Sequence, residues 1–164
     1  MADVNCIIQK SLCKGSDQMA QRQNLKFNIT ISQDLYEWAD PEKLKEARKK
    51  AVEAAGMVWA DETKELTREE DHIDTSLYVN SIGYVSNFAE TNKSGKGGRQ
   101  ATEADVIYNL EESQNETSLQ IGSAVKYAEH LEKRFGLMAR GLDRATPRMK
   151  RVSDYQIKKT LDLL

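Results

Sequence analysis

The strongest constraint on the fold is a long amphipathic helix that begins at Asp40-Pro41. Aspartate at a helix N-cap accepts hydrogen bonds from free backbone N–H groups. Proline at the first helical position loses no hydrogen bond, because the N–H that it lacks would have no partner there. Small and apolar residues then recur with the 3.6-residue spacing of one helix face. They are Leu44, Ala47, Ala51, Ala54, Ala55, Val58 and Trp59, whereas most charged side chains (Lys45, Arg48, Lys49, Lys50 and Glu53) fall elsewhere around the helix. The pattern predicts a helix to about Thr67 that packs against a sheet.

Strand patterns lie on both sides of this helix. Residues 26–32 alternate apolar and polar side chains, as a half-buried strand does. Residues 106–110 and 118–124 flank a polar turn at 111–116 and predict a hairpin. The stretch from Ile73 to Phe88 contains Tyr78, Ile82 and Tyr84, which favour a strand toward its C-terminal part.

Two further helices are expected near the C-terminus. Residues 126–135 carry apolar side chains at i+4 spacing, and Gly136 is placed to end that helix. After a loop at 137–141, a last helix is expected over about 142–163. The predicted order is β–α–β–β–β–α–α. This is an α+β fold with a small, mostly antiparallel sheet packed against the long helix and the C-terminal helices. Residues 1–25 are predicted to form an N-terminal extension, and residues 26–164 a single domain.

Composition restricts the classes of function. The chain has 24 Lys and Arg against 26 Asp and Glu, a net charge of −2, which is not the basic excess of a dedicated duplex-DNA binder. No apolar run is long enough for a membrane helix, and the start of the chain is too polar for a signal peptide, so we expect a cytoplasmic product and no membrane partner. Cys6 and Cys13 are then reduced thiols, and their spacing without a nearby histidine does not resemble a metal site.

No group of residues predicts catalysis. The glycine-rich segment around Gly95-Lys96 lacks the spacing of a phosphate-binding loop, because Gly97 follows the lysine. His72 and His130 each follow an acidic residue, but neighbouring residues point in different directions. Acidic pairs such as Glu69-Glu70 are expected to be solvated. We therefore predict a protein that is not an enzyme and uses no cofactor or metal.

Two stretches resemble the tail-completion, or head–tail joining, proteins of long-tailed bacteriophages. That family has an amphipathic helix followed by a stretch like P-x-D-T-G-x-L-x-x-S-I, and this chain reads H-I-D-T-S-L-Y-V-N-S-I over residues 72–82. Asp74, Thr75, Ser81 and Ile82 keep the pattern. His72, Ser76 and Tyr78 replace the usual proline, glycine and leucine.

The second stretch lies downstream of the predicted hairpin. The family's Y-A-x-x-x-E-x-G is matched by Tyr127, Ala128 and Glu132, with the glycine two residues late at Gly136. Its P-F-L-R-P-A is matched only by Leu142 and Ala145. The resemblance covers about residues 40–164. Thr75 is expected to stabilise a turn, and Tyr127 to pack on the sheet from a helix face.

The resemblance implies a structural subunit of the virion, a tail terminator that forms a closed ring, expected as a hexamer. Such a ring caps the tail tube, joins it to the head connector or stopper protein at the neck, and contacts passing DNA without reading its sequence. It uses two different surfaces of each subunit. The candidate interface residues lie in a loop at 90–103, at the hairpin tip and in an arginine-bearing segment at 133–151; they are Lys93, Lys96, Arg99, Glu111, Glu112, Arg134, Arg140, Arg144 and Arg148.

Other functions stay open at this point. A connector adaptor or stopper of the same particle, present in twelve copies, would share much of the pattern. A prophage-encoded regulator that binds nucleic acid would use the basic residues between Lys126 and Arg151 as its contact surface. Because most of these are arginines, which pack well at protein interfaces, we favour a protein partner. The expected location is the virion, after assembly in the host cytoplasm.

Overall fold

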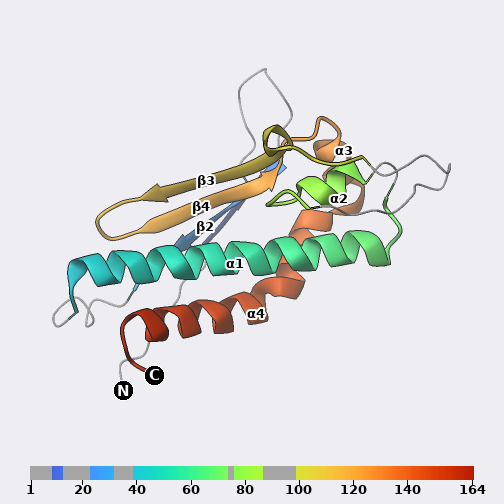
Figure 1. Cartoon of the computed structure of the whole chain (residues 1–164). Helices are drawn as coiled ribbons and strands as arrows, with labels where there is room; N and C mark the ends of the chain where they lie inside the picture. Colours follow the sequence, from blue (N-terminus) through green and yellow to red (C-terminus); the bar gives the residue numbers. More distant parts are fainter. Residues whose placement is uncertain (1–8, 13–22, 32–38, 74–75, 87–98) are drawn as a thin grey trace.

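Helix α1 is the axis of the computed structural model, and it lies between the sheet and helix α4 (Figure 1). The structure describes residues 9–12, 23–31, 39–73, 76–86 and 99–164. Apart from a short 3-10 helix at Glu103–Asp105, the elements in chain order are β1 (Gln9–Leu12), β2 (Gln23–Ile29), α1 (Pro41–Glu69), α2 (Leu77–Ser81), β3 (Val106–Glu112), β4 (Thr117–Ser123), α3 (Ala128–Phe135) and α4 (Leu137–Thr160).

The long helix and its start are confirmed. The Asp40 side chain accepts a hydrogen bond from the backbone N–H of Glu42 at 2.9 Å, and α1 continues for 29 residues. Every residue of the predicted apolar stripe except Ala54 is buried. The placement of Arg48 on the polar side was wrong, because its side chain is buried. Arg48 lies four residues after Leu44 and three before Ala51, on the same helix face.

The sheet is antiparallel throughout, in the order β1-β2-β4-β3. Alternation along β2 places Leu25, Phe27 and Ile29 in the core, where they pair with Ile121, Leu119 and Thr117 of β4. The Phe27 ring meets the Trp59 ring of α1 edge to face, with centroids 6.0 Å apart. The predicted hairpin is confirmed, and the α+β fold with it.

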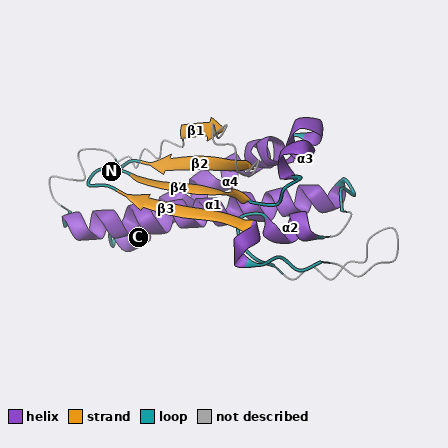
Figure 2. Ribbon diagram, turned by 90° about the horizontal axis from the view of Figure 1, so that it is seen from above, coloured by secondary structure: helices purple, strands orange, loops and turns teal. Residues whose placement is uncertain are grey.

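Helix α4 packs along α1 on the side away from the sheet (Figures 1 and 2). The Trp59 indole N–H donates to the Met138 carbonyl at 3.2 Å, and the Ser153 hydroxyl donates to the Ala51 carbonyl at 3.2 Å. The predicted loop at 137–141 was wrong. Gly136 adopts a left-handed conformation, with φ of 60°, that ends α3 and lets α4 begin at the next residue.

The predicted strand between Ile73 and Phe88 was also wrong. Residues 77–81 form the short helix α2, and all five are buried. The preference of tyrosine, valine and isoleucine for strands reflects their fit to a half-buried pleated surface, and this segment is enclosed instead. The observed order is therefore β–β–α–α–β–β–α–α. Strand β1 lies within the stretch 1–25 that was expected as an extension, and it pairs with β2.

Candidate functional site

The residues of the first family-like stretch anchor α2 to the end of the sheet. The Ser81 hydroxyl lies 2.7 Å from the Ser123 hydroxyl of β4, and it also donates to the Tyr78 carbonyl at 2.8 Å. The Ser123 oxygen in turn accepts from the backbone N–H of Val125 at 3.3 Å. Both hydroxyls are fully buried, so this network satisfies polar groups that would otherwise destabilise the core. Ile82 is buried beside it, whereas Asp74 and Thr75 lie outside the described residues.

In the second stretch, Glu132 connects α3 to α4. Its carboxylate accepts hydrogen bonds from the backbone N–H groups of Met138 at 2.7 Å and Ala139 at 3.1 Å. These groups belong to the first turn of α4, whose amides have no partner inside the helix. A carboxylate is also favoured by the partial positive charge at a helix N-terminus. Glu132 therefore caps α4 from a neighbouring helix.

We expect Glu132→Ala to lower the free energy of unfolding by about 1–2 kcal/mol, because it leaves the capped N–H groups without their acceptor. The matched control is Glu129→Ala, one turn earlier on α3, where an ion pair with the exposed Lys133 is lost and the expected change is below about 0.5 kcal/mol. Urea denaturation followed by circular dichroism measures both. Equal destabilisation by the two substitutions would contradict the capping role.

The remaining residues of the second stretch divide between core and surface. Ala128, Leu142 and Ala145 are buried, as expected of a fold motif. Tyr127 was predicted to pack on the sheet from a helix face, but it is the N-cap residue of α3 and is 40% exposed. The i+4 spacing from Tyr127 to Leu131 suggested a shared buried face, but the side chain of this N-cap residue lines a hollow beside α2.

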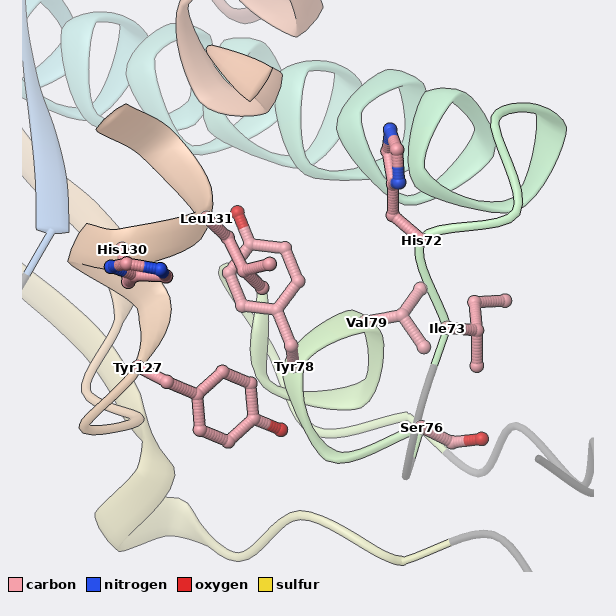
Figure 3. A pocket seen from close by; sticks show the side chains of 8 residues that line it. All are labelled: His72, Ile73, Ser76, Tyr78, Val79, Tyr127, His130 and Leu131. Carbon is pink, nitrogen blue, oxygen red and sulfur yellow. The ribbon is translucent and has the colours of Figure 1, made fainter. Parts of the chain in front are cut away.

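A hollow of about 240 Å³ opens between α2, α3 and the segment after α1 (Figure 3). Tyr78, Tyr127 and Leu131 line it, and His72 stands at its rim, stacked on Phe135 with ring centroids 3.8 Å apart. The Tyr78 hydroxyl is buried and has no hydrogen-bond partner among the residues that the structure describes, and burial raises the pKa of Tyr78 above its usual range. The lining is mostly apolar, so the hollow fits an apolar side chain better than a charged ligand.

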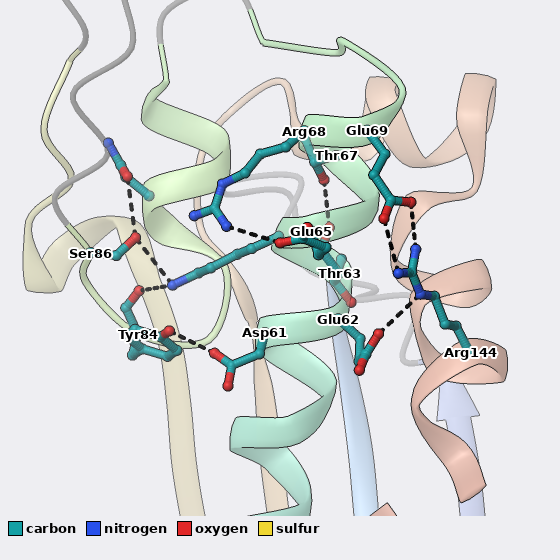
Figure 4. Close-up of polar contacts among 12 residues, drawn as sticks. Asp61, Glu62, Thr63, Glu65, Thr67, Arg68, Glu69, Tyr84, Ser86 and Arg144 are labelled. Carbon is teal, nitrogen blue, oxygen red and sulfur yellow. Dashed lines mark hydrogen bonds and ion pairs between the residues drawn. The ribbon is translucent and has the colours of Figure 1, made fainter. Parts of the chain in front are cut away.

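A second polar cluster surrounds the buried Lys64 of α1. Its ammonium group donates to the Tyr84 carbonyl at 2.9 Å and to the Ser86 hydroxyl at 3.3 Å, and it lies 3.2 Å from the centre of the Tyr84 ring. Burial lowers the pKa of Lys64 from 10.5 to about 7, although Asp61 opposes this shift. The Tyr84 hydroxyl donates to Asp61 at 2.7 Å (Figure 4), and burial with this contact raises the pKa of Tyr84 to about 12.

The arginine segment predicted as an interface pairs with glutamates of the same chain. Arg144 binds Glu69 at 2.6 Å and Glu62 at 3.0 Å (Figure 4). Arg148 also reaches Glu62, at 3.2 Å, and Arg140 binds Glu70. Hydrogen bonds from Arg144 and Arg140 lower the pKa of Glu69 and Glu70 respectively. These ion pairs lie at the surface along the seam between α1 and α4, where solvent screens the attraction between the charges.

The hairpin tip has intrachain partners as well. Glu111 pairs with Lys26 at 3.1 Å, a contact that lowers the pKa of Glu111, and Glu112 lies 3.4 Å from Lys45. The buried guanidinium of Arg48 donates to the carbonyls of Gln114 at 2.9 Å and Ser113 at 3.4 Å. These bonds hold the turn against α1, so the fold fixes the position of the hairpin tip.

The other candidate interface residues are placed differently. Arg134 lies near the Phe135 ring, 5.0 Å from its centre, and Arg99 is exposed. Lys93 and Lys96 lie outside the described residues. Within the described ranges, no group of three or more His, Cys, Asp or Glu side chains is arranged to hold a metal ion. None of the helices described is both long and apolar enough to cross a membrane.

No family model matches the chain, and comparisons with curated proteins and with solved structures give no match either.

Two charged residues, Arg48 and Lys64, are buried in the structure, and their burial was not predicted from the sequence. Helical spacing was the available signal for both. Arg48 follows Leu44 by four residues, and Lys64 follows the buried Ala60 by four, so each belongs to the inward face of α1.

Proposed function

We propose that this chain is a structural subunit of the head–tail junction of a tailed bacteriophage, a tail-completion protein that assembles into a closed ring. The ring caps the tail tube and presents a surface to the head connector, and DNA passes through its channel without sequence-specific contacts. The proposal rests on the resemblance of residues 72–82 and 127–145 to the tail-completion family.

The observation that carries the proposal is the structural role of the residues in these two stretches. Ser81 forms a buried hydrogen bond with Ser123, and Glu132 caps α4. Ala128, Leu142 and Ala145 are buried in the same core. If the match to the family motifs were coincidental, the matched residues would be found on the surface as often as in the core. Instead, most of the matched residues hold α2, α3 and α4 around the end of the sheet, which supports a shared fold motif.

The test is the mass of the purified protein in solution, measured by light scattering. Measurements are made with and without tail tubes assembled from the tube protein of the genome that encodes this chain. We expect a discrete ring of about six subunits, formed either in free solution or on the tube end. A ring of about twelve would favour the connector adaptor instead. A protein that neither assembles nor binds tubes would contradict the proposal.

A further inference from the structure

The outer edge of β3 is a strand edge without a partner among the described residues. β3 runs for seven residues, and among the described strands it pairs with β4 alone and is the outermost of the sheet (Figure 2). Natural proteins usually blunt such an edge with lysine, proline or a bulge, because it invites pairing with another chain. The central residues of this edge, from Ile107 to Leu110, include neither a charge nor a proline.

The hydrogen bonds of the hairpin show which backbone groups point outward. The N–H of Ser113 donates to Glu116, and the N–H of Ala124 donates to Asp105, each across the two strands. Hydrogen-bonded pairs alternate along an antiparallel ladder, so Ile107, Asn109 and Glu111 direct their backbone groups at β4. Tyr108 and Leu110 therefore direct theirs away from the sheet.

Exposed apolar side chains lie along the same edge. Tyr108 faces α1, where its hydroxyl donates to Glu53 at 3.2 Å, yet the residue is 44% exposed. Met57 follows Glu53 by one helical turn and is 46% exposed. These two side chains border the flank of α1 over which the sheet would continue beyond β3. An added strand would cover them while it pairs with the backbone of Tyr108 and Leu110.

The directions of the two outer strands allow β1 of a second copy to pair at this edge. Neighbouring strands alternate in direction across β1-β2-β4-β3, so β1 and β3 run in opposite directions at the two ends of the sheet. When copies of the chain are placed head to tail, β1 of one copy meets β3 of the next in antiparallel orientation. Such a contact uses two different surfaces, and it closes into a ring when the rotations between successive copies add up to a full turn.

We infer that the β3 edge, with Tyr108 and Met57 beside it, is the surface where the β1 edge of a second copy of this chain pairs. The inference rests on the ring of the proposed function and names the strands that form its subunit contact. Each contact then continues the antiparallel sheet from one subunit into the next, as in other cases of strand addition.

The experiment compares two substitutions at one residue. Tyr108→Pro removes an outward N–H that no bond to β4 uses, and proline is tolerated on strand edges for this reason. Tyr108→Val loses the same ring but keeps the N–H. Light scattering of the full chain should show rings for the wild type and for Tyr108→Val, and a single chain of 18.6 kDa for Tyr108→Pro. Thermal unfolding establishes that all three proteins are folded.

Amide hydrogen exchange supplies a second measurement that needs no substitution. The amides of Tyr108 and Leu110 should exchange at least tenfold more slowly in the assembled wild type than in the dilute single chain. Rings of undiminished size from Tyr108→Pro, or fast exchange of these two amides in the ring, would overturn the inference and leave the proposed function intact. An assembly that stops at two subunits would also overturn the inference, because it would indicate that β3 of one copy pairs with β3 of the other.

Binding to tail tubes separates this inference from the proposed function. Rings that require the Tyr108 N–H but ignore tubes would support the strand contact and contradict the role at the head–tail junction. A wild type that stays a single chain at high concentration and on tubes would overturn the strand contact.

Discussion

Gly141→Ala is expected to lower the free energy of unfolding by about 2–3 kcal/mol. In an open helix position the same change would stabilise by about 1 kcal/mol, because alanine is the better helix former. Here α4 crosses α1 at close range. A Cβ at Gly141 would lie 2.2 Å from the Thr63 hydroxyl oxygen and 3.0 Å from the Thr63 Cα. The Thr63 backbone cannot move away from the new Cβ, so the overpacking costs more free energy than the gain in helix propensity returns.

Thermal unfolding measures the effect, which should appear as a fall in Tm of roughly 5–10 °C. Gly136→Ala is the control. Its new Cβ would meet nothing nearer than the Arg140 Cδ at 3.9 Å, so only the left-handed backbone costs energy, about 1–2 kcal/mol. Thr63→Ala combined with Gly141→Ala should be less destabilised than the sum of the single changes, because the closest contact is gone. An increase in Tm with Gly141→Ala would contradict the close crossing of the helices.

The second large effect is a rise in stability with pH that depends on Lys64. The folded protein holds this ammonium group in a buried position, which lowers the pKa of Lys64 to about 7, whereas the unfolded chain keeps the ordinary value of 10.5. Below pH 7 both states carry the proton. As the pH rises above 7, the folded state releases its proton first, and deprotonation favours folding. The free energy of unfolding should therefore increase by up to about 1.4 kcal/mol per pH unit between pH 7 and 9.

Lys64→Met should remove this slope. Urea denaturation at pH 7, 8 and 9 gives the unfolding free energy of each protein, and the difference in slope isolates Lys64 from other titrating groups. Lys50→Met is the matched control, since Lys50 is an exposed lysine of the same helix, paired with Glu46. Lys50→Met should keep the wild-type slope. A wild type and Lys64→Met with the same slope would show that Lys64 is not held in the buried cluster with Asp61, Tyr84 and Ser86.

Local patterns were sufficient where one segment carries its own signals. The start of α1 has both an N-cap aspartate and a proline, and its apolar stripe repeats over several turns, so its position could be predicted. The hairpin likewise has two alternating runs around one polar turn. The segment from Leu77 to Ser81 has strand-favouring residues and yet forms a helix, whose five residues are all buried. A sequence pattern does not contain that burial.

The arginines predicted as interface residues also show what the sequence could and could not indicate. The arginines of α4 were recognisable as a concentration of positive charge, but the sequence did not indicate that Glu62, Glu69 and Glu70 of α1 lie opposite them. These partners are about 70–86 residues away along the chain. Only the packing of α4 on α1 brings the two sets together, so these arginines form ion pairs within the chain.

The amino-acid sequence by itself determined the α+β class, the long helix, the hairpin and the cap at Gly136, because each depends on periodicity or on residues close together in the chain. The tertiary structure decided the burial of Arg48 and Lys64, the capping of α4 by Glu132 and the partners of the arginines. It also decided which strand is left at the edge of the sheet. Each of these depends on contacts between distant segments, whose free energy is set by how the elements pack and not by the order of neighbouring residues.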